Sequence, residues 1–70
     1  MAYSNIEAER ARAGLTRTEL AAEMGVSLPT YNKYVAEMTP IPSDKLLYLH
    51  NRFSVTVDYL LGLNAEKKKQ

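Results

Sequence analysis

Few residues of this chain have the chemistry of a catalytic or metal-binding group. Its 70 residues include no cysteine and one histidine, His50, so no disulfide forms within the chain and a metal site would need carboxylate ligands. The patterns HExxH, GxxxxGK(S/T), GxGxxG and GxSxG do not occur, which argues against metal, nucleotide and serine-hydrolase chemistry. We therefore expect no enzyme, no cofactor and no metal site, and we interpret His50 as a partly buried, hydrogen-bonded structural residue.

Two hydrogen-bonding side chains, Asn32 and Lys33, lie in a segment, residues 24–36, that contains no acidic residue. An amide both donates and accepts hydrogen bonds, and an ammonium group donates three. Because the segment has no carboxylate, nothing in it repels a phosphate. The two residues form either a recognition surface or a solvated helix face, and the elements that hold them decide between these interpretations.

The charge of the chain is nearly balanced but unevenly distributed. The net charge is +1, and removing the +2 of residues 66–69 leaves residues 1–65 at −1. The chain is 46% apolar and 24% charged, which is typical of a globular domain, and no apolar run approaches the ~18 residues of a membrane span. The N-terminus also lacks a signal peptide, so we expect a single cytoplasmic domain, with no membrane contact and no room for a ligand-sensing domain.

The first part of the chain predicts two short helices joined by a turn. Each would begin at a capping box, a Ser or Thr followed three residues later by Glu: Ser4 with Glu7, and Thr16 with Glu19. Gly14 and Gly25 stand where a left-handed residue ends a helix. We therefore predict helices over about residues 5–13 and 17–24.

A third helix is predicted over residues 28–36. Ser27 is its expected N-cap, and Pro29 is tolerated because first-turn N–H groups have no intrahelical partner. Tyr31 and Tyr34 have the spacing of one helix face, and we expect them in the core rather than stacked on bases. The polar residues expected on the outer face are Thr30, Asn32 and Lys33.

Two further helices are predicted after a proline-containing loop, residues 37–43, in which Ile41 is the expected apolar anchor. Ser43 is predicted to cap a helix over residues 44–52, with an apolar stripe of Leu46, Leu49 and Phe53. Thr56 is predicted to cap a short helix over residues 57–61 that ends at Gly62. We assign residues 1–63 to one domain and residues 64–70 to a flexible basic tail.

Four segments give the chain a family resemblance: AGLTRTELAAEMGVS (residues 13–27), TYNKY (30–34), Pro42 and LLYLHNRFSVTVDYLLG (46–62). They resemble the lambda-repressor-like (Cro/C1-type, XRE) helix-turn-helix family over roughly residues 5–62. The resemblance implies an all-α, compact five-helix DNA-binding domain, with the helix-turn-helix at its second and third helices.

The same resemblance implies a sequence-specific transcriptional regulator that binds a double-stranded DNA operator with its third helix in the major groove. A repressor of phage or mobile-element type, a restriction controller and an antitoxin all fit. Arg17 would contact phosphate, and Asn32 and Lys33 would reach adenine and guanine edges. The other residues that it places at the DNA are Ser27, Leu28, Pro29 and Thr30.

The sequence departs from the family pattern at three places. Leu28 and Pro29 are apolar where Arg or Gln is common. Residues 35–37 replace a Glu-Asn-Gly, so Arg10 needs Glu37 or a backbone carbonyl as its partner. Ser54 takes the place of a glycine after the fourth helix.

Two partner hypotheses follow from apolar residues. The C-terminal part is predicted to leave apolar surface for a homodimer through the last helix, formed by Tyr48, Phe53, Tyr59, Leu60 and Leu63. The alternative to DNA binding is a protein-interaction module, in which Leu28, Pro29 and the neighbouring tyrosines bind a protein partner. Steep salt dependence would distinguish DNA binding from an apolar protein interface.

Overall fold

The computed structural model describes residues 3–63 and contains five α-helices. They are α1 (Ser4–Arg12), α2 (Arg17–Met24), α3 (Leu28–Val35), α4 (Ser43–Phe53) and α5 (Val57–Leu60). No strand occurs in this range, so the predicted all-α fold is confirmed. The predicted tail, residues 64–70, lies outside the described residues.

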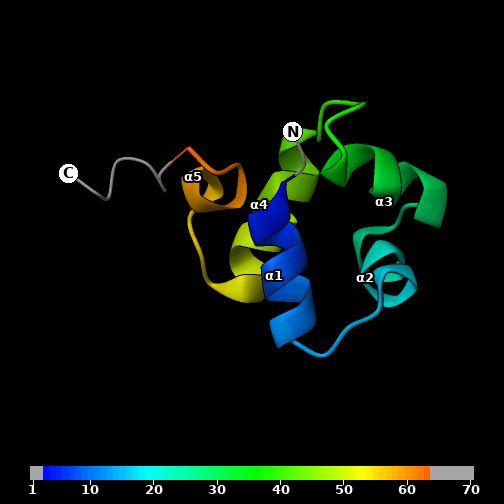
Figure 1. Cartoon of the computed structure of the whole chain (residues 1–70), viewed down its shortest axis with the longest axis horizontal. Helices are drawn as coiled ribbons and strands as arrows, with labels where there is room; N and C mark the ends of the chain where they lie inside the picture. Colours follow the sequence, from blue (N-terminus) through cyan, green and yellow to red (C-terminus); the bar gives the residue numbers. More distant parts are fainter. Residues whose placement is uncertain (1–2, 64–70) are drawn as a thin grey trace.

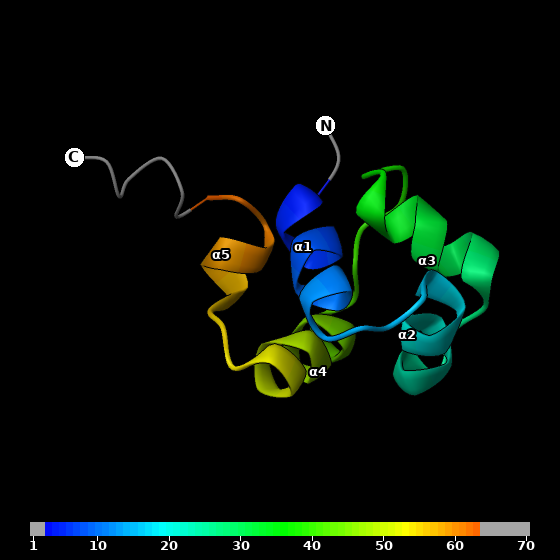
Figure 2. The ribbon, with the colours of Figure 1, turned by 60° about the horizontal axis from the view of Figure 1, so that its bottom comes forward.

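The helices are arranged along one axis of the molecule. Helices α2 and α3 lie at one end and α5 lies at the other, with α1 and α4 between them (Figures 1 and 2). Helix α2 packs against α3, α1 contacts both α3 and α5, and α4 packs against α5. None of the helices in residues 3–63 has the length and hydropathy needed to span a membrane.

Three of the predicted N-terminal caps are confirmed. Thr16 and Glu19 form a reciprocal capping box at α2, Ser27 accepts a hydrogen bond from the Thr30 N–H at α3, and Thr56 accepts one from the Tyr59 N–H at α5. These bonds satisfy N–H groups that have no partner inside the helix. The beginning of the helix-turn-helix is therefore determined by local sequence.

The other two predicted caps are wrong. Ser4 and Ser43 are the first helical residues of α1 and α4, the N-cap positions belong to Tyr3 and Pro42, and neither makes a side-chain cap bond. At α1 the capping box fails because the Glu7 carboxylate binds Arg10, Arg17 and Tyr31 instead.

A residue with a left-handed backbone conformation lies one or two positions after each helix, as the sequence predicts for Gly14 and Gly25. Helix α2 ends at Gly25, with φ 76°, and α4 ends at Ser54, with φ 55°. A residue with a Cβ atom is disfavoured in this conformation. Ser54 therefore adopts the strained geometry that the family pattern assigns to glycine.

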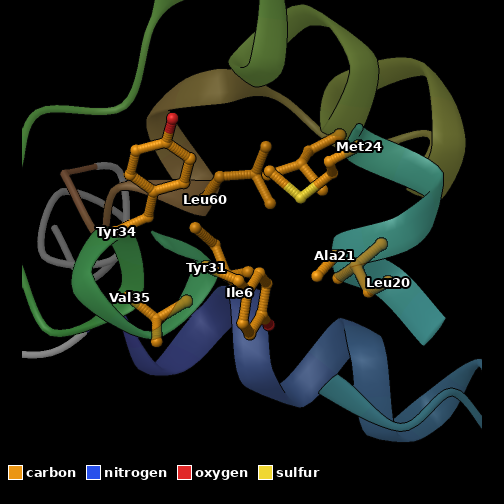
Figure 3. Packing of buried hydrophobic residues seen from close by; sticks show 9 residues of the cluster. Ile6, Leu20, Ala21, Met24, Tyr31, Tyr34, Val35 and Leu60 are labelled. Atoms are coloured by element: carbon orange, nitrogen blue, oxygen red, sulfur yellow. The ribbon is translucent and has the colours of Figure 1, made fainter. Parts of the chain in front are cut away.

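The core joins all five helices. Figure 3 shows Ile6 of α1, Tyr31 of α3 and Leu60 of α5 pointing into one cluster, and all three are fully buried. The buried apolar residues are Ile6, Leu20, Ala21, Met24, Tyr31, Tyr34, Val35, Leu49 and Leu60. The core positions of Tyr31 and Tyr34 are thus confirmed, and Ile41 packs against the cluster as expected.

Three tyrosine–glutamate hydrogen bonds also connect the helices. Each tyrosine hydroxyl donates to a carboxylate that also pairs with an arginine. The pairs are Tyr31 with Glu7 at 2.6 Å, Tyr59 with Glu9 at 2.9 Å, and Tyr48 with Glu23 at 2.7 Å. They connect α3 to α1, α5 to α1 and α4 to α2, so each carboxylate bridges two helices.

The C-terminal part differs in one respect from the sequence prediction. Leu60 is fully buried and does not belong to the exposed apolar surface predicted there. Leu63 is 58% exposed, and Phe53 is partly buried against the core. His50 is partly buried with its Nδ1 at 2.5 Å from the Val55 carbonyl oxygen, which confirms the predicted partial burial and hydrogen bond.

Candidate nucleic-acid interface

The first turn of α3 is held by a pair of hydroxyl groups. Ser27 Oγ accepts from the Thr30 N–H at 3.3 Å and donates to Thr30 Oγ1 at 3.0 Å. Leu28 and Pro29 follow Ser27 and are exposed. The start of α3 therefore presents a fixed backbone with apolar atoms beside two hydroxyl groups.

Polar side chains of α2 and α3 meet beside this turn. Arg17 is the first residue of α2 and its side chain is half-exposed. Its Nη1 donates to Asn32 Oδ1 of α3 at 3.4 Å. Lys33 is exposed. The structure thus brings Arg17 and Asn32 into contact, whereas Ser27 and Thr30 form a separate pair.

Arg17 is also bound to the interior of the molecule. Its Nε donates to Glu7 Oε1 at 3.0 Å, and the same carboxylate oxygen accepts from Arg10 at 3.1 Å. The Tyr31 hydroxyl binds the other oxygen of Glu7. Although partial burial acts to raise the pKa of Glu7, the hydrogen bonds from Tyr31, Arg10 and Arg17 outweigh it and lower that pKa. Glu7 is therefore held ionised at the centre of this cluster.

One of the two partners of Arg10 is a backbone carbonyl, as one of the two sequence hypotheses expects. Arg10 donates to the Leu15 carbonyl oxygen at 2.5 Å and also to Glu7. The Glu7 hydrogen bond raises the pKa of Arg10 despite the opposing effect of burial. Glu7 thus supplies a carboxylate partner for Arg10 from within α1.

Comparisons with known proteins agree with this architecture. A family model described as helix-turn-helix matches residues 6–60. The chain belongs to this helix-turn-helix family. It is of the Cro/C1 type within that family, as the sequence resemblance predicts.

Two curated relatives of this helix-turn-helix chain come from Bacillus subtilis strain 168. The uncharacterized HTH-type transcriptional regulator YobD is 43% identical over 52 residues, which is 74% of this chain and 46% of YobD. The HTH-type transcriptional regulator ImmR is 33% identical over 60 residues, which is 86% of this chain and 47% of ImmR. The chain thus spans about half the length of either relative. No solved structure gives a significant match.

The sequence interpretation missed Glu7 as part of this surface. Glu7 and Arg17 are ten residues apart, a separation that helical periodicity does not relate. A partial signal was present, because Glu7 and Arg10 have the i, i+3 spacing of a helix ion pair. No group of three or more metal-ligand side chains is placed to hold a metal ion in residues 3–63.

Proposed function

We propose that this chain is the DNA-binding part of a transcriptional regulator and inserts α3 into the major groove of duplex DNA. The observation that carries the proposal is the outer side of the helix-turn-helix. There, Arg17 lies beside Asn32, Lys33 is exposed, and residues 24–36 contain no carboxylate. The curated names of both relatives support regulation of transcription.

Each side chain of this surface has a role that matches its chemistry. Arg17 would bind a phosphate with the N–H groups that its protein partners leave unused, and this contact positions the domain without reading sequence. Asn32 suits an adenine, because an amide pairs with N6 and N7, and Lys33 suits guanine or phosphate. Leu28 and the Thr30 methyl group suit thymine methyl groups, while Ser27 and Pro29 border the backbone.

The proposal is tested by selecting bound fragments from random DNA duplexes and measuring the affinity of variants for the selected duplex. Arg17→Ala should weaken binding to all DNA sequences, because a phosphate contact is lost, and lower the salt slope by about 1. Asn32→Ala should relax preference at one base pair, and Lys33→Ala should lower affinity, each without unfolding the domain. Unchanged affinity in both α3 variants would contradict this assignment.

The competing protein-interaction function loses part of its basis. Tyr31 and Tyr34, which would have contributed to an apolar docking surface, are buried at 0% and 7% exposure. Only Leu28, at 37% exposure, and Pro29 remain as apolar groups at the start of α3. Binding that is insensitive to salt would favour this alternative over DNA.

We also propose that the regulator acts in the cytoplasm as a homodimer and represses transcription by occupying its operator. The exposed Leu63 and the partly buried Tyr48, Phe53 and Tyr59 support association near α5. A dimer would place two α3 helices on half-sites about 34 Å apart. Sedimentation at tens of micromolar that shows only a 7.9 kDa species would reject the dimer without affecting the DNA proposal.

A further inference from the structure

We propose that Glu7 is a positioning residue for base recognition, because through Arg17 it orients the Asn32 amide. This inference rests on the proposed DNA-binding function and adds to it a determinant of specificity outside α2 and α3. Glu7 belongs to α1, and its side chain is only 21% exposed. It would therefore act on DNA through other side chains rather than by direct contact.

The first step is the orientation of Arg17. A guanidinium group is planar, so fixing the direction of one N–H group also restricts the others. Glu7 Oε1 binds Arg17 Nε at 3.0 Å. The carboxylate itself is held by Arg10 and Tyr31, so this anchor is connected to buried structure. Arg17 thereby has less freedom than an arginine that extends into solvent.

The second step is the orientation of Asn32. An arginine only donates hydrogen bonds, so the amide group that faces Arg17 Nη1 at 3.4 Å must be the oxygen, Oδ1. The Asn32 NH₂ group is then turned away from Arg17. Recognition of adenine uses both ends of the amide, and Oδ1 keeps a second lone pair for the adenine N6 amino group. The amide would thus reach the base edge in a preset orientation, which lowers the entropic cost of the contact.

The third step concerns charge. Glu7 offsets part of the positive charge of Arg10 and Arg17, beside a surface proposed to face phosphates. A neutral residue at this position would strengthen nonspecific attraction to DNA and also release Arg17 from its anchor. Loss of the Glu7 carboxylate should therefore strengthen nonspecific binding to DNA and weaken recognition of the base read by Asn32. Replacing a residue that only stabilises the fold would change nonspecific binding and base recognition in the same direction.

Glu7→Gln tests this inference against Glu23→Gln as a matched control. Glu23 also accepts from a tyrosine and an arginine, Tyr48 and Arg52, at 2.7 and 2.8 Å. These partners lie on α4, whereas Arg17 and Asn32 belong to α2 and α3. The two variants therefore remove the same kind of carboxylate with different proposed effects on DNA.

The readout is the ratio of affinities for the selected duplex and for the same duplex with the base pair read by Asn32 replaced. We expect Glu7→Gln to lower this ratio about 5-fold or more, within the discrimination of a bidentate contact. Affinity for a scrambled duplex should stay equal or rise. Glu23→Gln should leave the ratio within about 2-fold of wild type. A Glu7→Gln ratio equally close to wild type would overturn the inference.

Arg17→Lys provides a second test if Glu7→Gln does not fold. Lysine keeps the positive charge but has no planar fork to bind Glu7 and Asn32 together. We expect a similar salt slope and a lower ratio at the same base pair, and an unchanged ratio would overturn the inference. A wild-type protein with no sequence preference would instead refute the proposed function, so the two failures are distinguishable.

Discussion

At both ends of the molecule, a tyrosine hydroxyl from a later helix donates to a glutamate of α1. At the helix-turn-helix end, Tyr31 binds Glu7, which also binds two arginines, one of which reaches Asn32. At the α5 end, Tyr59 binds Glu9, whose arginine partner Arg12 has a side chain that is 68% exposed. The Tyr31–Glu7 pair thus connects the core to the polar surface of the helix-turn-helix, whereas the Tyr59–Glu9 pair joins α5 to α1.

The two carboxylates also differ in burial and in number of partners. The Glu9 side chain is 9% exposed and that of Glu7 is 21% exposed. Within residues 3–63, the more buried carboxylate also has fewer hydrogen-bond donors, two for Glu9 and three for Glu7. Since a buried charge is costly when it loses a partner, the α5 end should be the more sensitive of the two to loss of a tyrosine hydroxyl.

The largest expected effect separates the two tyrosines. Tyr59→Phe should lower the free energy of unfolding by about 1–3 kcal/mol, because among the described residues Glu9 would keep only its ion pair with exposed Arg12. Tyr31→Phe should cost about 0.5–1.5 kcal/mol, because Glu7 would keep two guanidinium partners. Urea unfolding of both variants measures the difference. A larger loss of unfolding free energy for Tyr31→Phe than for Tyr59→Phe would show that the number of hydrogen bonds to each glutamate does not determine the cost.

A second contrast lies in the residues that end α2 and α4. Gly25→Ala should destabilise the domain by about 1 kcal/mol through backbone strain. Steric clash should add little to this cost, because the nearest atom to the added Cβ is Lys45 Nζ at 3.8 Å. Ser54→Gly should stabilise it by less than about 1 kcal/mol, because relief of strain is offset by greater freedom in the unfolded chain. Thermal unfolding checks both signs, and a destabilised Ser54→Gly would contradict this account.

A smaller effect is expected from acid. Because the pKa of Glu7 is lowered on folding, its contribution to stability is present above its ordinary pKa of 4.5. That contribution is lost as the pH falls below this value toward the pKa of the folded state. Glu7→Gln cannot titrate, so the difference in unfolding free energy between wild type and variant should shrink from pH 7 to pH 3. Urea unfolding at several pH values measures this difference in unfolding free energy. A difference that does not change with pH would argue against a stabilising role of the Glu7 ion pairs with Arg10 and Arg17.

Local sequence signals predicted most of the fold. The helix-turn-helix was predicted with the observed α2 bounds and the caps at Thr16 and Ser27, because these features depend on neighbours within a few residues. Ser4 and Ser43 were predicted wrongly as caps. The spacing of a capping box at Ser4 and Glu7 was present, but long-range partners bind the Glu7 carboxylate in the folded chain.

The candidate site was predicted less completely. The exposure of Lys33 agrees with the helical pattern, whereas assignment of the seven interface residues to DNA stays a prediction. The contact between Arg17 and Asn32 joins two helices across fifteen residues, and no periodic pattern expresses it. The complete burial of Leu60 was not predicted either, because it depends on how α5 packs against the rest of the domain.

The amino-acid sequence by itself determined the helices, the turn and the outward position of Lys33, since caps, glycines and apolar spacing act over single turns of chain. Tertiary structure alone decided which carboxylates Tyr31, Tyr59 and Arg17 bind. Such choices depend on how α1 lies between α3 and α5, with Glu7 facing one and Glu9 the other. A charged side chain binds the donors that folding brings near it, and these donors are distant in the sequence.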